Sequence, residues 1–143
     1  MSAGQDYQFV DTNVLIYAHD TSAGAKRDRA VWLLEELWES RSGCLSVQVF
    51  QEFYVNITRK VAHPLESSTA AQILADLSVW RVHAPDVGDV LAAIGIQRRY
   101  GIAFWDAMIL QSAARLGCET VWSEDLNSDQ VYDGVRVANP FDG

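Results

Sequence analysis

Short apolar segments alternate with longer amphipathic ones along the sequence, and no other feature limits the possible folds as strongly. In the longer segments apolar residues recur at helical spacing, whereas the short segments span only three or four residues. Parallel strands need long crossover connections, which helices usually supply. The alternation therefore predicts an α/β fold, a three-layer α/β/α sandwich with a short parallel sheet. The predicted strands are 7–10, 44–46, 81–83, 119–122 and 135–138.

The predicted helices begin and end near residues that commonly cap helices. Ser67 or Ser68 can cap one helix. Asp86 begins another, which stops near Gly101, and Asp106 opens the last one. The polar stretch 123–134 is expected to be a loop. The predicted helices are 12–18, 26–40, 47 up to Pro64, 67–79, 86–101 and 106–116.

The length and composition are those of one ordinary globular domain. The 143 residues, of which 49% are hydrophobic and 21% charged, can bury a core without a disulfide or a structural metal. We find no linker, internal repeat or low-complexity tract in the sequence. We therefore expect a single domain over residues 1–143.

The cysteines and the apolar runs indicate a cellular compartment. Cys44 and Cys118 lie in apolar surroundings and are expected to be buried free thiols, as in reduced cytosolic proteins. No run approaches the roughly 18 apolar residues of a membrane span, and the first residues lack the pattern of a signal peptide. We expect a cytoplasmic protein that does not associate with a membrane.

The net charge of −8 argues against a protein that binds nucleic acid through a broad basic surface. Four carboxylates that held a divalent cation would account for half of that charge and leave −4. The three histidines are isolated and give no zinc-binding pattern. The net charge therefore still argues against nucleic-acid binding, although less strongly once a bound cation is counted.

Four acidic residues are placed where separate segments can meet. Asp11 ends the first predicted strand and Asp125 follows the strand 119–122. Asp106 opens a helix, and Glu52 lies on the polar side of another. Ligands of open parallel sheets bind outside the carboxyl ends of the strands. Mg²⁺ and Mn²⁺ prefer oxygen ligands, so a carboxylate cluster at this edge would suit them.

Each of these acids also has an ordinary structural interpretation. Asp11 and Asp106 are suitable helix caps, Glu52 could be a solvated helix residue, and Asp125 one loop acid among several. Spacing alone does not choose between the two interpretations. It also leaves open whether the fourth position belongs to Asp125 or to a nearby acid, and the neighbouring acids are Glu119, Glu124, Asp129 and Asp133.

Four segments together resemble the motifs of one protein family. Residues 9–17, Phe-Val-Asp-Thr-Asn-Val-Leu-Ile-Tyr, resemble the first motif of PIN-domain nucleases, and 104–107, Phe-Trp-Asp-Ala, the third. Residues 48–54 resemble the segment with the second acid, and 123–126 the segment with the fourth. The closing 139–141, Asn-Pro-Phe, is also similar. The resemblance runs from about residue 7 to residue 141.

The resemblance implies a chemistry for the four acids. Asp11 would be the central ligand of one or two Mg²⁺ or Mn²⁺ ions and Asp106 a second ligand. Glu52 would be an outer ligand, or a ligand of a second metal, that orients the water. Asp125 would complete the pocket, with Glu124 and Asp129 as alternatives. The implied activity is endonucleolytic cleavage of RNA, with single-stranded RNA or tRNA as substrate. The products would carry 5′-phosphate and 3′-hydroxyl ends.

The resemblance also implies partners, because single-domain PIN proteins of this length are often VapC-type toxins, each held inactive by an antitoxin protein. The apolar surface of the helix from Trp32 to Trp38 suggests packing against an antitoxin or against a second copy in a homodimer. We expect Trp32, Trp38 and Trp80 to be core or interface residues rather than RNA-stacking platforms.

Several polar residues are candidates for supporting roles near the four acids. Thr12, Asn13 and Ser123 could orient a carboxylate, or could simply cap helices. Basic side chains near Glu52 and Asp106 in the sequence could contact phosphate, although a solvated position is the more ordinary interpretation for each of them. These basic residues are Arg59, Lys60, Arg98 and Arg99.

Two other functions compete with the nuclease. Transfer of a phosphoryl group through Asp11 is disfavoured because the Asp-x-Asp-x-Thr pattern is missing, with Asn13 at its third position. A PIN-fold module that binds RNA or protein without catalysis is the stronger alternative. Retention of all four acids favours the nuclease. The amino-acid sequence does not predict which RNA sequence is cut.

Overall fold

The computed structural model describes residues 6–142, which form a mostly parallel six-stranded sheet with helices on both sides. The sheet order is β3-β2-β1-β4-β6-β5. The strands are β1 Gln8–Val10, β2 Gly43–Ser46, β3 Arg81–His83, β4 Thr120–Trp122, β5 Val131–Tyr132 and β6 Val135–Ala138. The helices are α1 Thr12–His19, α2 Ala25–Ser40, α3 Val47–Arg59, α4 Ser67–Leu77, α5 Val87–Tyr100 and α6 Phe104–Arg115.

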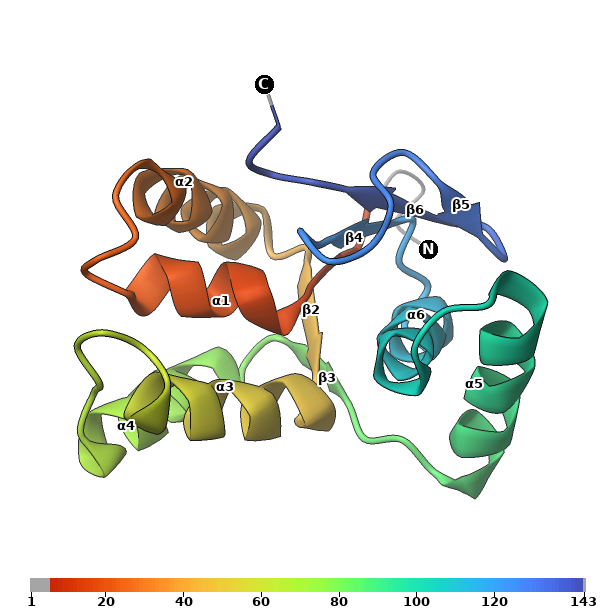
Figure 1. The fold of residues 1–143 in the computed structure, drawn as a ribbon, viewed down its shortest axis with the longest axis horizontal. Coiled ribbons are helices and arrows are strands. Elements are labelled where there is room, and N and C mark those ends of the chain that lie inside the picture. Colours follow the sequence, from red (N-terminus) through yellow and green to blue (C-terminus); the bar gives the residue numbers. More distant parts are fainter. Residues whose placement is uncertain (1–5, 143) are drawn as a thin grey trace.

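Three layers are visible in Figure 1, with α1 to α4 on one side of the strands and α5 and α6 on the other. Strand β1 pairs in parallel with β2 and β4, with Phe9 opposite Cys44 on one side and Val121 on the other. Its flanking strands pair in parallel with β3 and β6. The predicted α/β/α sandwich is confirmed, and its central strand is the one that ends at Asp11.

The C-terminal hairpin departs from the predicted loop 123–134. Strand β5 runs antiparallel to β6, with Tyr132 opposite Val135. Asp133 and Gly134 make the turn between them at φ angles of 50° and 86°. Both central residues of a tight hairpin turn need positive φ, and Asp-Gly is a preferred pair for it. The sequence signal for this hairpin was therefore present at residues 133 and 134.

Three helix boundaries differ from the prediction. Helix α3 ends at Arg59, before Pro64, and the Leu65 amide then donates to the Ile57 carbonyl as the chain turns back. The N-cap of α4 is Glu66, without a side-chain cap bond from either predicted serine. Helix α6 begins at Phe104 after Ala103, so Asp106 lies in its first turn and does not open it. By contrast, Asp86 caps α5 as predicted.

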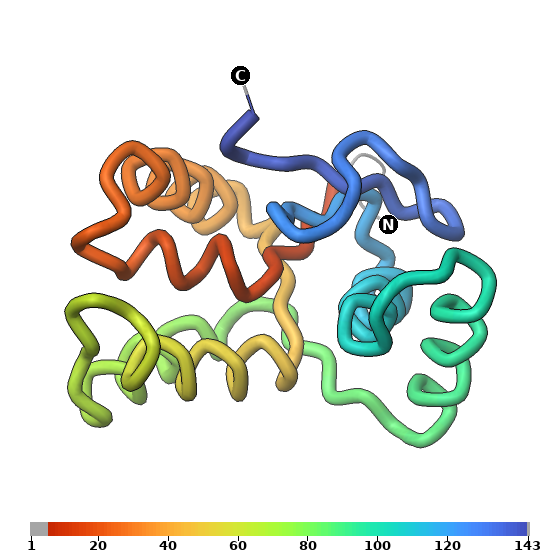
Figure 2. The backbone as a smooth tube through the Cα atoms, in the orientation of Figure 1, coloured from red at the N-terminus to blue at the C-terminus, as the bar shows by residue number. Residues whose placement is uncertain are grey.

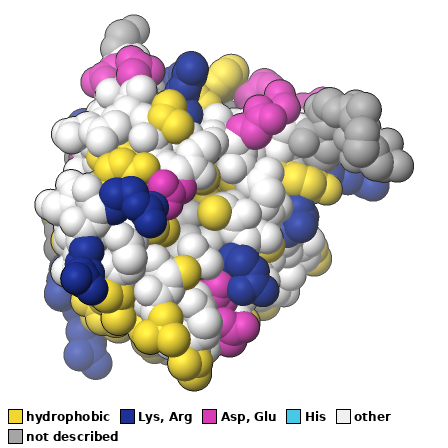
Figure 3. All heavy atoms as spheres, turned by 90° about the vertical axis from the view of Figure 1, so that its right-hand side faces the viewer, with side chains coloured by type: hydrophobic (Ala, Val, Ile, Leu, Met, Phe, Trp, Pro, Cys, Tyr) yellow, Lys and Arg dark blue, Asp and Glu magenta, His cyan; other side chains and the backbone are white. Residues whose placement is uncertain are grey.

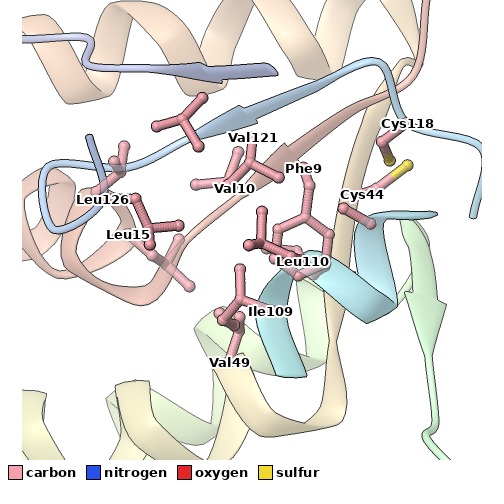
Figure 4. Packing of buried hydrophobic residues seen from close by; sticks show 14 of the residues in the cluster. Phe9, Val10, Leu15, Cys44, Val49, Ile109, Leu110, Cys118, Val121 and Leu126 are labelled. Carbon is pink, nitrogen blue, oxygen red and sulfur yellow. The ribbon is translucent and has the colours of Figure 1, made fainter. Parts of the chain in front are cut away.

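The core lies between the sheet and the helices on its two faces. Figure 4 shows Phe9 and Val121 from the central strands packed near Ile109 and Leu110 of α6. All four side chains are buried, and each large aliphatic or aromatic side chain contributes about 1.5–3 kcal/mol through burial. This packing fixes α6 against the sheet.

The cysteines are free and buried, as predicted. Cys44 on β2 and Cys118, which precedes β4, meet side by side in Figure 4. Their contact lowers the pKa of Cys44 and raises that of Cys118, because each thiol is the other's hydrogen-bond partner. Because both thiols are buried, they serve as small core side chains.

The tryptophans divide between packing and surface. Trp32 and Trp38 are about half exposed, at 48% and 47%, so neither is a core residue. Trp38 packs at a tilt against Trp80, whose ring covers Gly43. The role of Trp32 and Trp38 in an interface stays a prediction.

The C-terminal segment returns to the helices after the last strand. Figure 2 traces it from β6 back toward α2, where Arg29 Nε donates to the Pro140 carbonyl. The Phe141 ring meets Tyr17 edge to face. Across residues 6–142 no helix is long and apolar enough to cross a membrane.

Candidate active site

Asp11 occupies the centre of the site because it follows the central strand directly. Its backbone amide donates to the Trp122 carbonyl, which continues the pairing of β1 with β4. Its side chain caps α1, with Oδ1 accepting from the Thr12 amide at 2.7 Å. Oδ2 accepts from Ser123 Oγ, also at 2.7 Å. The cap interpretation of Asp11 is thus confirmed, and its role as a metal ligand stays a prediction.

The environment of Asp11 opposes its negative charge. The side chain is 4% exposed, and burial raises its pKa to about 7 against the opposing effect of its Ser123 and Thr12 hydrogen bonds. The charges of Asp125 and Glu52 raise it further. A buried carboxylate in this state is stabilised by a cation.

Glu52 extends from α3 toward the start of α1. Thr12 Oγ1 donates to Glu52 Oε1 at 2.6 Å, and Gln48 Nε2 donates to Oε2 at 3.2 Å. Gln48, on the same helix face, is buried, and Glu52 itself is half-buried. The alternative interpretation of Glu52 as a fully solvated helix residue is therefore wrong, because Glu52 contacts α1 through Thr12 and is hydrogen-bonded to Gln48, which contacts α6.

Asp106 reaches the same edge from the opposite layer. Helix α6 leads into β4, so its N-terminal turn lies near the carboxyl ends of the strands. The half-buried Asp106 has a raised pKa, caused first by burial and then by the charges of Asp125 and Glu52. Its position in the first helical turn favours a negative side chain.

Asp125 is the acid of the C-terminal loop that turns toward the others. Asn13 Nδ2 donates to its Oδ2 at 3.1 Å, and its amide donates to Ser123 Oγ at 3.1 Å. Its charge acts on both Asp11 and Asp106.

The competing loop acids are engaged elsewhere or lie in turns. Glu124 forms an ion pair with Lys26 and accepts a hydrogen bond from Tyr17. Asp133 pairs with Arg99, and Asp129 occupies an exposed turn at φ 67°. The geometry thus favours Asp125 for the fourth position.

The supporting residues proposed from the sequence are only partly engaged. Thr12, Asn13 and Ser123 all hydrogen-bond to one of the four acids. Arg99 is paired with Asp133 and so is not a free phosphate contact. The other three basic candidates, Arg59, Lys60 and Arg98, are exposed.

The four carboxylates influence one another without forming a closed set of ligands. Over the described range 6–142, no three His, Cys, Asp or Glu side chains form a ready-made metal-binding group. In the same range no Lys, Arg or His lies within 4.0 Å of a carboxylate oxygen of the four. Repelling carboxylates that lack a counter-charge suit a divalent cation, which would draw them together.

Gln48 also belongs to this candidate site, although it was not predicted from the sequence. Its Nε2 donates to Glu52 Oε2 and also to the Trp105 carbonyl at 3.1 Å, next to Asp106. The signal available was its position four residues before Glu52, which places both side chains on one helix face. The contact with α6 had no sequence signal.

Comparison with known proteins agrees with this fold. The family model described as PIN domain matches residues 9–134. No curated protein matches the sequence.

Three solved structures share the fold at low sequence identity. A toxin–antitoxin complex from Klebsiella pneumoniae is 19% identical over 94% of this chain and 98% of that chain, with a TM-score of 0.70. Mycobacterium tuberculosis VapC20, described as a sarcin-ricin-loop-cleaving toxin, is 21% identical over 82% and 91%, with a TM-score of 0.64. DNA-bound VapBC from Salmonella typhimurium is 18% identical over 94% and 98%, with a TM-score of 0.65.

Proposed function

Because this chain belongs to the PIN-domain family, we propose that it is a metal-dependent endoribonuclease formed by one PIN domain over residues 1–143. One observation supports the proposal: the charges of Asp125 and Glu52 raise the pKa of both Asp11 and Asp106, and over residues 6–142 none of these four carboxylates has a basic partner within 4.0 Å. A binding module would have no need of this arrangement, which costs electrostatic free energy.

The donors fit Mg²⁺ or Mn²⁺, because all four are hard oxygen ligands. Asp11 and Asp106 would hold the ion, with Glu52 and Asp125 as further ligands. When bound, such an ion lowers the pKa of a water and stabilises negative charge on a phosphodiester.

The chain's own residues then orient the carboxylates. Ser123 and the Thr12 amide fix the two oxygens of Asp11, and the Thr12 hydroxyl fixes Glu52. Asn13 holds Asp125 toward Asp11 and also bonds to Ser123 at 3.4 Å. Ligands held in this way lose less freedom on binding, so these bonds should raise metal affinity.

The proposal is tested by incubating the purified chain, free of any partner, with single-stranded RNA and with tRNA in Mn²⁺ or Mg²⁺. Cleavage should disappear with chelator and in Asp11→Asn and Asp106→Asn, but persist in Glu36→Gln, an exposed acid on α2. RNA binding without chelator-sensitive cleavage on any RNA would instead support the alternative, a binding module.

We further propose that the chain is the toxin of a toxin–antitoxin pair and acts in the cytoplasm. The Klebsiella pneumoniae neighbour is a toxin–antitoxin complex. An apolar cavity of about 300 Å³ lies between α1, α2 and α4, lined by Val31, Leu34, Trp38, Ile73 and Leu77 among others, and it suits apolar side chains of an antitoxin. Expression should arrest growth, and Asp11→Asn or co-expression of an adjacent antitoxin frame should relieve the arrest.

We also propose that the chain forms a homodimer through α5. Figure 3 views the molecule from this side, where apolar and basic side chains are interspersed. Val87, Val90, Leu91 and Ile94 are exposed at helical spacing on α5. Light scattering should give a dimer mass for the wild-type chain and a monomer mass for Leu91→Glu; a monomer in both would refute the dimer.

A further inference from the structure

Gln48 links the two helices that carry Glu52 and Asp106. Its Nε2 atom has two protons, and both are used: one bond goes to Glu52 Oε2 at 3.2 Å and the other to the Trp105 carbonyl at 3.1 Å. Trp105 precedes Asp106 in the first turn of α6. The carboxamide therefore joins α3 to α6 at the acids.

The bonds around Gln48 continue to Asp11 through Thr12. Glu52 Oε1 accepts from the Thr12 hydroxyl at 2.6 Å, so each of its oxygens has its own donor. The Thr12 amide in turn donates to Asp11 Oδ1 at 2.7 Å. One hydrogen-bonded path thus connects Asp11 and Glu52 with the backbone next to Asp106.

The other end of the Gln48 carboxamide has no partner. The side chain is 7% exposed, and Oε1 is buried without a hydrogen bond in the described part of the chain. A buried acceptor without a donor is destabilising, whereas an apolar side chain of similar size would avoid that cost. Packing and stability alone therefore do not explain a glutamine at this position.

The two acceptors of Gln48 do not depend on it for stability. The carbonyl of residue 105 lies within α6, where a carbonyl accepts from the amide four residues later. Glu52 is half-buried and keeps the Thr12 hydroxyl on its other oxygen. Loss of Gln48 would free the position of Glu52 without leaving a buried group unpaired.

We propose that Gln48 is a positioning residue that fixes Glu52 relative to Asp106 for divalent-cation binding, an inference that rests on the proposed function. The unpaired Oε1 is the cost of placing a two-proton donor between the helices. A glutamine occupies this position nonetheless, because its two Nε2 hydrogen bonds set the separation of Glu52 and Asp106, two ligands that belong to different layers.

The test replaces Gln48 by methionine, which has similar length and no hydrogen-bond donor. Gln51→Met is the matched control, since Gln51 is exposed on the same helix. Calorimetric titration with Mn²⁺ should give a Kd raised about 10- to 100-fold for Gln48→Met and unchanged for Gln51→Met. For RNA cleavage kcat should fall while KM stays the same. The urea midpoint without metal should equal or exceed that of wild type.

Each other result has a definite meaning. Equal Mn²⁺ affinity in the two variants would overturn the role of Gln48 and leave the nuclease proposal intact. A lower urea midpoint that accompanies weaker binding would also overturn it, because general loosening of the fold gives that pattern. A wild-type chain that binds no Mn²⁺ would remove the proposed function together with this inference.

A measurement on the wild-type chain covers the case in which Gln48→Met does not fold. The side-chain amide protons of Gln48 should exchange with solvent more slowly than those of Gln51, and their NMR signals should shift when Mg²⁺ is added. Equal exchange of the two side chains would show that the bridge between α3 and α6 is not formed.

Discussion

The Thr12 hydroxyl donates to Glu52 Oε1 at 2.6 Å, although the two residues lie 40 positions apart in the sequence. Thr12 is the first residue of α1 and its amide also bonds to Asp11. One residue therefore sets the positions of two acids from different segments. This relationship makes the site a connected unit rather than a set of independent carboxylates.

Thr12→Val should weaken cation binding more than it weakens the fold. The change removes the hydroxyl that orients Glu52 while keeping the shape and the amide bond to Asp11. We expect a loss of about 1 kcal/mol in the free energy of unfolding and a rise of about tenfold in the Kd for Mn²⁺. Thr12→Ser, which keeps the hydroxyl, should stay near wild type in both. Equal Mn²⁺ affinity in both variants would contradict this role.

The stability of the metal-free chain should fall with rising pH because of Asp11. Its pKa is raised by burial from 3.8 to about 7, so between these values the folded state binds more protons than the unfolded state. The contribution of Asp11 is therefore fully present below about pH 4 and is lost as pH rises to about 7. The linked change is about 4 kcal/mol.

Asp11→Asn isolates this contribution. Urea unfolding in chelator at several pH values should show the variant gaining on wild type from pH 4 to 7, with a constant difference above pH 7. Mn²⁺ should then stabilise wild type and have little effect on the variant. A wild-type minus variant difference that does not change with pH would show that Asp11 ionises normally.

The identity of the fourth acid should be visible in a pair of loop variants. Asp125→Asn should lower the cleavage rate about tenfold or more, because Asp125 is electrostatically coupled to Asp11 and Asp106. Asp129→Asn, which changes an exposed acid of the same loop, should leave it unchanged. The reverse order of the two rates would assign the position to Asp129.

The contact between α5 and α6 should depend on Asp89, which is 1% exposed. Its carboxylate accepts from Gln111 and pairs with Arg115 and His83. Burial opposes the charge, but these partners and the Asp86 amide hold the pKa near 2. Asp89→Ala leaves them without their acceptor and should cost about 3 kcal/mol in chemical denaturation. A loss below about 1 kcal/mol would show that the cluster is not a structural centre.

The layer order and most helices could be predicted from the sequence, because periodicity reports which residues face a core. The position of Asp11 followed from the rule that parallel sheets bind ligands at the carboxyl ends of their strands. The start of α6 was misplaced, since Asp106 is a good cap and Phe104 and Trp105 carry no cap signal. Local propensity favoured Asp106 as the cap, whereas tertiary packing places the first turn of α6 at Phe104.

Contacts between distant segments had no local signal. Glu124 is removed from the site by Lys26, 98 residues away, and periodicity does not report such a pairing. The same holds for Gln48 and the carbonyl of Trp105. For Glu52 the sequence left both a ligand and a solvated position open, because the residues that contact it through Thr12 and Gln48 come from other parts of the chain.

The rate of RNA cleavage as a function of Mn²⁺ concentration, for wild type and Asp11→Asn free of any partner, tests the central claim most directly. We predict saturable cleavage by wild type that chelator abolishes and excess Mn²⁺ restores, and no cleavage by the variant. Cleavage that persists in chelator, or that is equal in the two proteins, would contradict the assignment of the four carboxylates as a metal-dependent active site.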